Sequence, residues 1–327
     1  MISIKSLDKR WLLLGAGGQL GQEWANRLED DGCDYKALSR NDLDITNQTS
    51  VAKTVAEYRP DIIINTAAYT AVDNAEGEIE AANQINNVAP GQLARICAEY
   101  GIMLVHYSTD YVFPGRLDDR SRYPDGYPET AAAEPVNTYG RTKWLGEEAI
   151  RKENGQHLIL RVSWLCGHHG KNFIHTMLRL ANERDQVSVV NDQYGCPTFT
   201  APTVENTIAL IRAEARGTYH ISSAGETTWY EFACAIFKER GIQVFERTGK
   251  AGNDSGSTQT NENVDEPDAD DGKAPLTVMP VSTPEFPTRA KRPAWSRLGI
   301  KRLAEVRGSR ILPWQEELAL FMRDLKK

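Results

Sequence analysis

Residues 11–21 read WLLLGAGGQLG, a short apolar strand that runs directly into a glycine-rich turn. Gly15, Gly18 and Gly21 give the spacing G-x-x-G-x-x-G, and apolar Leu20 and Trp24 follow at a helical interval. Glycine lets a backbone approach a pyrophosphate closely, and the start of the following helix offers free N–H groups and positive charge. Glycine is common in any loop, so the signal comes from the strand before it and the helix after it. Together they predict a dinucleotide-binding unit.

The rest of the chain continues this alternation of strands and helices. Apolar runs typical of buried strands lie at 61–65, 102–108 and 157–163, and helix-period segments lie at 50–58, 89–100, 139–153 and 172–184. The pattern predicts an α/β fold, a Rossmann-type doubly wound parallel sheet. We expect residues 1–165 to form mainly the NAD(P)-binding domain. Residues 166–327 should form mainly a smaller C-terminal substrate-binding lobe, interleaved with the sheet domain.

Charge is unevenly distributed along the 327 residues, which carry 38 Lys and Arg against 45 Asp and Glu. Residues 249–275 hold seven of the acidic side chains and only two lysines, with almost no apolar side chains. Such a segment cannot bury enough surface to offset the entropy of ordering, so we expect an exposed, mostly disordered acidic insertion. The nearly neutral remainder argues against a basic nucleic-acid-binding protein.

Several other classes are disfavoured. No apolar run approaches the roughly 20 residues that span a bilayer, and the first residues lack a secretory signal, so we expect a cytoplasmic protein without membrane contact. The five cysteines are widely spaced without a C-x-x-C pair, which is typical of reduced thiols. His168 and His169 are adjacent and lack ligands at metal spacing, so we name no metal ligand.

Cofactor preference is normally set at the end of the second strand, here expected around 35–40. An acid at that point would bind the ribose 2′-hydroxyl of NADH, but the chain has Ser39 and Arg40. A guanidinium can pair with a 2′-phosphate, so NADPH is favoured and NADH stays possible. The alternative is that Arg40 is only a solvated loop charge.

A second motif combines a phenol with an ammonium group. Tyr139 and Lys143 stand four residues apart and share one face of the expected helix. A tyrosine that exchanges protons needs nearby positive charge, because its ordinary pKa is about 10. One such pair arises easily by chance, as a helix surface pair. However, the apolar run 102–108 leads into Thr109 and Asp110, at the strand end where open α/β sheets bind ligands. Glycine loop, strand-end hydroxyl and Tyr/Lys pair in this order are a strong signal.

These motifs make the chain resemble the extended short-chain dehydrogenase/reductase family, and within it the dTDP-4-dehydrorhamnose reductases. The resemblance covers nearly the whole chain. It rests on GAGGQLG at 15–21, RPDIIINTAAYTAVDNAE at 59–76, VHYSTDYVFPG at 105–115, NTYGRTKWLGE at 137–147, LRVSWL at 160–165, NFIHTMLRLA at 172–181, VVNDQYGCPT at 189–198 and RPAWSRL at 292–298. The middle and C-terminal strings are the most specific, because the wider superfamily shares only the glycine loop and the Tyr/Lys pair.

The resemblance implies a role for each matching position. Tyr139 would protonate the C4 oxygen of the sugar, Lys143 would hold the nicotinamide ribose and lower the pKa of Tyr139, and Thr109 would hydrogen-bond the carbonyl. Asp110, Trp164 and Arg292 would contact the substrate, Trp164 by packing on the sugar and Arg292 at the nucleotide diphosphate. Cofactor contacts would come from Gly15, Gly18, Gln19, Leu20, Gly21, Arg40, Asp44, Ile45, Ala68, Tyr69, Thr70, Tyr107, Tyr139 and Lys143.

The function implied is NADPH-dependent reduction of the C4 ketone of dTDP-4-dehydro-L-rhamnose. Two alternatives stay open: an epimerase or reductase for another nucleotide sugar, and a noncatalytic NADP-binding subunit like the regulatory subunit of methionine adenosyltransferase. The resemblance also implies a homodimer, with Mg²⁺ possible at its interface through glutamates that cannot be assigned in this sequence.

Overall fold

The computed structural model describes residues 4–246 and 275–325. The acidic insertion expected at 249–275 therefore lies outside the described residues, except for its last residue. Within the two described ranges, no helix combines the length and apolar character needed to cross a membrane.

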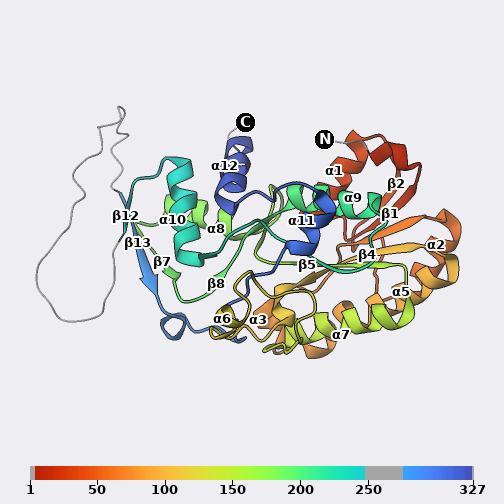
Figure 1. Ribbon diagram of the computed structural model, residues 1–327, viewed down its shortest axis with the longest axis horizontal. Helices are drawn as coiled ribbons and strands as arrows, with labels where there is room; N and C mark the ends of the chain where they lie inside the picture. The colour runs from red at the N-terminus through yellow and green to blue at the C-terminus, as the bar shows by residue number, and fades with distance from the viewer. Residues whose placement is uncertain (1–3, 247–274, 326–327) are drawn as a thin grey trace, which may run out of the picture.

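A six-stranded parallel sheet forms the centre of the larger domain, which confirms the predicted α/β class (Figure 1). Its strands are β1 (Arg10–Leu14), β2 (Asp34–Leu38), β3 (Ile62–Asn65), β4 (Met103–Thr109), β5 (His157–Val162) and β10 (Gly217–Ile221). They run in the order β10-β5-β4-β3-β1-β2. The chain forms β2 on one side of β1 and β3 on the other side, so the direction in which strands are added reverses at β1. Ligands of open α/β sheets bind in the crevice at such a switch point.

Helices cover both faces of this sheet, as the continuous apolar runs of strands such as β1 and β3 require. On one face lie α1 (Gln19–Asp30), α9 (Thr200–Arg212) and α11 (Lys301–Arg307), packed on a core that includes Trp11, Trp24 and Ile208. On the other face lie α2 (Gln48–Tyr58), α5 (Ala89–Tyr100) and α7 (Thr138–Glu153), packed on a core that includes Leu12 and Ile63. The larger domain therefore takes β10, α9 and α11 from the C-terminal half of the chain.

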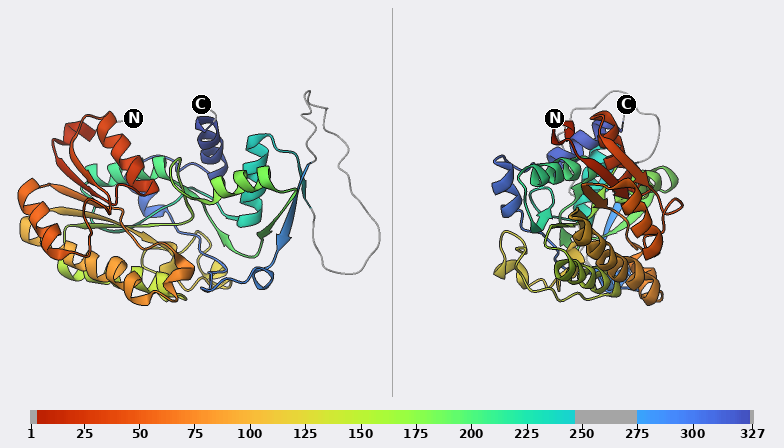
Figure 2. Two further views of the ribbon diagram at one scale, coloured as in Figure 1. Left: turned by 180° about the vertical axis from the view of Figure 1, so that it is seen from behind. Right: turned by 90° about the vertical axis from the view of Figure 1, so that its right-hand side faces the viewer.

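The smaller lobe lies beyond the carboxyl ends of the strands (Figure 2). A three-stranded parallel sheet of β12 (Val244–Glu246), β13 (Leu276–Val281) and β7 (Gln186–Val190) packs with α8 (Phe173–Glu183), α10 (Trp229–Arg240) and α12 (Trp314–Asp324). Two short strand pairs complete this lobe: β6 (Leu165–Cys166) with β9 (Thr198–Phe199), and β8 (Tyr194–Gly195) with β11 (Thr227–Thr228).

The connections contain further short elements. These are the helices α3 (Val72–Ala75), α4 (Ile79–Asn83) and α6 (Asp119–Arg122), a π-helix at Gln84–Val88, and 3₁₀ turns at Ile4–Leu7, Asp110–Val112 and Thr283–Glu285.

The position of α7 depends on a close backbone approach. A Cβ atom added to Gly146 would lie 2.0 Å from the carbonyl oxygen of Asn86 in the π-helix, a distance no side chain tolerates. The amide of Asn86 in turn donates to the hydroxyl of Thr142 at 3.1 Å and to the carbonyl of Tyr69 at 3.0 Å. Glycine at 146 therefore lets α7 lie directly on this connection, with Tyr139 and Lys143 near the strand ends.

Gly146→Ala should destabilise the protein, because the new methyl group overlaps the Asn86 carbonyl and forces α7 away. Overpacking of this kind costs about 1–3 kcal/mol of unfolding free energy. The matched control is Gly155→Ala, where an added Cβ has no neighbour within 4 Å. Urea unfolding should place the control within about 0.5 kcal/mol of the parent. Equal midpoints for all three proteins would contradict the close-approach argument.

Candidate functional site

The glycine loop opens on a cavity of about 380 Å³ at the switch point of the sheet. It is lined by Gly15, Gly17, Gly18, Ser39, Arg40, Asn41, Leu43, Asp44, Ile45, Thr66, Ala67, Ala68 and Ile85. A Cβ on Gly21 would lie 2.2 Å from the carbonyl oxygen of Gly15, so only glycine allows α1 to start this close to the loop. The residue before α1 is Gly18, which has no side chain to cap the first N–H groups of the helix. The cavity thus joins a tight backbone cradle to an open helix N-terminus, the chemistry that fits a dinucleotide pyrophosphate.

The structure separates the predicted cofactor residues into two groups. Gly15, Gly18, Arg40, Asp44, Ile45 and Ala68 line this cavity, together with Asn41, Leu43 and Thr66, which the motif did not single out. Gln19, Leu20, Gly21, Tyr69, Thr70 and Tyr107 are not among its lining residues. The Gln19 amide donates to the carbonyl of Leu165 at 3.1 Å, and the Leu20 side chain is buried in the core. The Tyr69 hydroxyl donates to Glu78 at 3.0 Å.

Tyr107 needs a correction, because its side chain does not make a strand-end contact. The ring is 7% exposed, and its hydroxyl lies 2.8 Å from both the Trp24 indole nitrogen and the Thr207 hydroxyl. The phenol therefore joins β4 to α1 and α9 inside the core. What Tyr107 presents to the site is its carbonyl oxygen, which accepts a hydrogen bond from Lys143.

Thr109 and Tyr139 meet where β4 ends and α7 begins. The Asn137 side chain caps α7 by accepting from the Gly140 N–H at 2.8 Å, and this fixes the first helical turn. The Thr109 hydroxyl lies close enough to the phenol of Tyr139 to lower the pKa of that phenol. The Tyr111 ring lies edge-on to the Tyr139 ring, with centroids 5.8 Å apart. Two of the three predicted catalytic side chains are thus neighbours at the site.

Burial governs the electrostatics of Tyr139 in the protein without ligands. It raises the pKa of Tyr139 to about 12; the Thr109 hydroxyl opposes this rise and the Asp110 carboxyl adds to it. Loss of water around the ring outweighs the stabilisation of a phenolate here, and the expected lowering of this pKa by Lys143 stays a prediction. The phenol holds its proton at neutral pH, as a proton donor must.

Lys143 is buried rather than exposed beside the phenol. Its ammonium nitrogen Nζ lies 2.6 Å from the Tyr107 carbonyl oxygen and 3.1 Å from Nε2 of His106, and the side chain is among the most buried in the protein. Burial lowers the pKa of Lys143 to about 8, and the carboxylate of Glu147 opposes this change. Among the described residues, the hydrogen-bond partners of Lys143 are thus His106 and Tyr107, both on β4.

Asp110 is the acidic group nearest to the Thr109–Tyr139 pair. Its side chain is 2% exposed, and Oδ1 accepts a hydrogen bond from the Thr109 hydroxyl at 3.0 Å. Burial raises the pKa of Asp110 to about 7, against hydrogen bonds from Ser296 and Thr109. Oδ1 of Asp110 therefore orients Thr109, whereas Oδ2 is buried without a hydrogen-bond partner among the described residues.

The two other predicted substrate residues come from the connections to the smaller lobe. Trp164 has a left-handed backbone (φ 45°), and its ring stacks on Trp229 with centroids 3.6 Å apart. Nη2 of Arg292 pairs with the carboxylate of Asp73 at 2.7 Å. Arg292 is thus already neutralised by Asp73 and fastens the C-terminal segment to α3.

Sequence reasoning missed a buried polar network beneath the site. Glu147 and Arg161 form a two-pronged ion pair, with distances of 2.9 Å from Nε to Oε1 and 2.7 Å from Nη2 to Oε2. The Ser108 hydroxyl donates to the same carboxylate at 2.5 Å. Arg161, inside the apolar run of β5, was an available signal, because an ionisable residue in a buried strand needs a partner.

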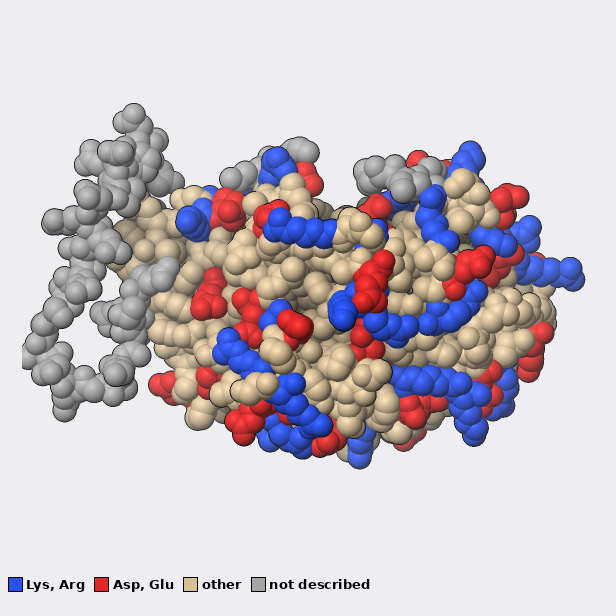
Figure 3. Space-filling view, in the orientation of Figure 1, with Lys and Arg blue, Asp and Glu red and all other residues tan. Residues whose placement is uncertain are grey.

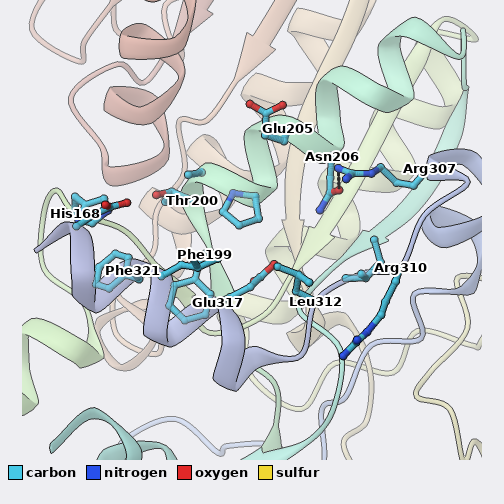
Figure 4. Close-up of a pocket in the computed structure, with 15 residues that line it drawn as sticks. His168, Phe199, Thr200, Glu205, Asn206, Arg307, Arg310, Leu312, Glu317 and Phe321 are labelled. Atoms are coloured by element: carbon cyan, nitrogen blue, oxygen red, sulfur yellow. Dashed lines mark hydrogen bonds between the residues drawn. The ribbon is translucent and has the colours of Figure 1, made fainter. Parts of the chain in front are cut away.

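A second cavity, of about 390 Å³, lies away from these groups (Figure 4). Phe199, Pro202, Leu320 and Phe321 give it apolar walls, and His168 stacks on Phe321 with centroids 4.2 Å apart. Asn206 and Arg307, drawn in Figure 4, hydrogen-bond one another across its edge. None of the predicted catalytic residues lines it, so we place the chemistry at the strand ends instead.

Charge on the molecular surface is mixed. On the face shown in Figure 3, Lys and Arg alternate with Asp and Glu over both domains. Within the described ranges, His, Cys, Asp and Glu form no group of three or more that could hold a metal ion, so the expected Mg²⁺ gains no support.

Comparison with known proteins identifies the family. The family model "RmlD substrate binding domain" matches residues 9–327. A dTDP-4-keto-6-deoxy-D-glucose reductase of Streptomyces niveus is 43% identical over 71% of this chain and 79% of its own length. A dTDP-4-dehydrorhamnose reductase of Salmonella typhimurium is 39% identical over 89% of each chain. The crystal structure of a dTDP-4-dehydrorhamnose reductase from Bacillus anthracis in complex with NADP superposes with a TM-score of 0.82, at 35% identity, over 97% of this chain and 99% of that one.

Both the match over nearly the whole chain and the shared six-stranded fold lead to one conclusion. The chain belongs to the RmlD family.

Proposed function

We propose that this chain is an NADPH-dependent reductase that converts the C4 ketone of dTDP-4-dehydro-L-rhamnose into the alcohol of dTDP-L-rhamnose. The observation that carries the proposal is the placement of Thr109 beside a protonated Tyr139 at the carboxyl end of β4. Relatives named as reductases of dTDP-4-keto sugars, and a relative solved with NADP, support the substrate class and the cofactor.

The residues divide the work of a ketone reduction. NADPH, when bound, supplies the hydride that adds to C4. Negative charge then grows on the ketone oxygen, where Thr109 donates a hydrogen bond and Tyr139 gives its proton. A phenol with a pKa near 12 keeps that proton until the oxygen becomes basic. In the protein without ligands the Thr109 hydroxyl donates to Asp110, and this O–H would turn to the ketone oxygen when substrate binds.

Cofactor binding is assigned to the glycine-loop cavity. Gly18 and the open start of α1 would receive the pyrophosphate, and Asp44 and Ile45 would flank the adenine. Arg40 would pair with the 2′-phosphate, which makes NADPH the preferred cofactor over NADH. Trp164, stacked on Trp229, would pack against the sugar, and Arg292 would meet the nucleotide diphosphate.

Two other functions compete with this proposal. The Streptomyces niveus relative favours a reductase for a related dTDP-4-keto-6-deoxy sugar, since the same Thr109–Tyr139 pair would serve it. A noncatalytic NADP-binding subunit would not need that pair, which is intact here. The homodimer and the cytoplasmic location stay predictions.

Purified protein with dTDP-4-dehydro-L-rhamnose should consume NADPH, which is followed as loss of absorbance at about 340 nm. Tyr139→Phe should lower kcat by a factor of about 10²–10⁴, because the proton donor is gone. The dissociation constant for NADPH should stay within about twofold of the parent value. Tyr100→Phe, at a tyrosine 51% exposed on α5, is the matched control and should retain full activity. Turnover of dTDP-4-keto-6-deoxy-D-glucose at a higher kcat/KM would assign the competing substrate.

Arg40→Ala should weaken NADPH binding by about tenfold or more and leave NADH binding nearly unchanged, because only NADPH carries the 2′-phosphate. Lys53→Ala, on exposed α2, controls for general loss of positive charge. Dissociation constants measured by fluorescence titration for both cofactors check this. Equal loss for NADPH and NADH would show that Arg40 does not read the phosphate.

A further inference from the structure

His106 lies inside β4, next to Asn65 at the end of β3, in the buried part of the sheet. The two residues are paired in the parallel register, and both side chains are almost fully buried. Nδ2 of Asn65 lies 3.0 Å from Nδ1 of His106, and Nε2 of His106 lies 3.1 Å from Nζ of Lys143. A continuous chain of side chains therefore runs from the β3 end to Lys143.

The direction of the first hydrogen bond follows from the amide of Asn65. Its oxygen Oδ1 accepts from the backbone N–H of Ala67 at 3.1 Å. A flipped amide would put two donors face to face, so Nδ2 must point at His106. Nδ1 of His106 is then an acceptor and carries no proton. A neutral ring with a bare Nδ1 has its proton on Nε2, the nitrogen that faces Lys143.

The same accounting applies to Lys143. An ammonium group has three donors and no acceptor, whereas a neutral amine has two donors and one lone pair. Lys143 already donates to the Tyr107 carbonyl at 2.6 Å. An ammonium at Nζ would meet the Nε2–H of His106 as donor against donor, but an amine can accept that hydrogen. A protonated imidazole is excluded, because Nδ1 accepts from Asn65.

We infer that His106, oriented by Asn65, is a positioning residue that favours the neutral amine of Lys143 in the protein without cofactor. It does so by donating Nε2–H to the Lys143 lone pair. The consequence for catalysis rests on the proposed function: Lys143 must hold a proton to stand as a cation near the phenolate that Tyr139 leaves behind, and His106 makes that proton easier to lose. His106 thereby sets the pH range in which the site is charged for reduction.

The other charged groups near Lys143 do not cancel the effect of His106 on the proton of Lys143. Glu147, one helical turn along α7, favours the ammonium, but Arg161 on β5 and Arg151 on α7 already neutralise its carboxylate. Tyr139, on the same helix, is neutral, and Asp110 lies beyond it at the strand end. Burial keeps the pKa of His106 well below its usual range and lowers that of Lys143 to about 8.

The tautomer of His106 can be read directly from ¹⁵N NMR of the histidine side chains in the cofactor-free protein, which has six histidines. His106→Gln identifies the His106 signals, and backbone-linked assignment of the parent protein serves if that variant does not fold. We expect a protonated Nε2, a bare Nδ1, and no titration of this ring between about pH 5 and 9. A protonated Nδ1, or a ring that titrates near 6.5, would overturn the inference.

The effect on Lys143 is tested by the pH profile of kcat. The parent should lose activity as pH rises through about 8, because Lys143 loses its proton there. In His106→Gln the amide oxygen can accept from an ammonium, so this alkaline limb should move up by about one pH unit or more. His169→Gln, at a partly exposed histidine that contacts Asn26, should leave the limb in place. An unmoved limb in His106→Gln contradicts the positioning role.

The two experiments keep this inference separate from the proposed function. Absence of turnover at every pH would rule out the proposed reductase activity. The NMR measurement of the His106 tautomer would still test the inference about His106, because it does not depend on turnover. Normal turnover with the wrong tautomer would remove the inference about His106 alone.

Discussion

The site depends on how closely the backbone of α7 can approach the connections around it. A Cβ on Gly140 would lie 2.1 Å from the carbonyl oxygen of Tyr111, and one on Gly146 would lie 2.0 Å from that of Asn86. Gly140 directly follows Tyr139 in α7, and Gly146 lies three residues after Lys143. Because the helix lies directly on the strand-end turns, the phenol reaches Thr109 and the amine reaches the backbone of β4. A helix displaced by the width of a methyl group would separate both pairs.

This close packing excludes water, and the polar groups beneath α7 respond in different ways. Burial opposes the charge of Glu147, but Arg161 and Arg151 supply enough positive charge to hold its pKa below the usual range. Among the described residues, the close partners of Lys143 are a carbonyl and a neutral imidazole, so burial lowers its pKa. Tyr139 stays protonated for the same reason. Burial of a charge is tolerated only where a partner compensates it, and here the uncompensated groups shift toward their neutral forms.

Much of the fold was predictable from local pattern, and part of the site was not. Apolar runs and the glycine turn predicted β1, β3, β4 and β5, because parallel strands buried on both faces leave continuous apolar segments. Thr109 and Tyr139 were found because strand ends and helix starts converge on one edge of the sheet. The inward phenol of Tyr107 and the Asn65–His106–Lys143 chain were missed, since they depend on which face of a strand each side chain occupies and on partners 37 or more residues away.

The central claim is that the Thr109–Tyr139 pair holds a sugar ketone where hydride adds to C4. The most direct measurement uses NADPH deuterated at the transferred position, together with dTDP-4-dehydro-L-rhamnose, and locates the label in the product by NMR. The account predicts one deuterium at C4 of the sugar, with dTDP-L-rhamnose as the product. Label at another carbon, or a C4 that carries only protium while NADPH is consumed, would contradict it.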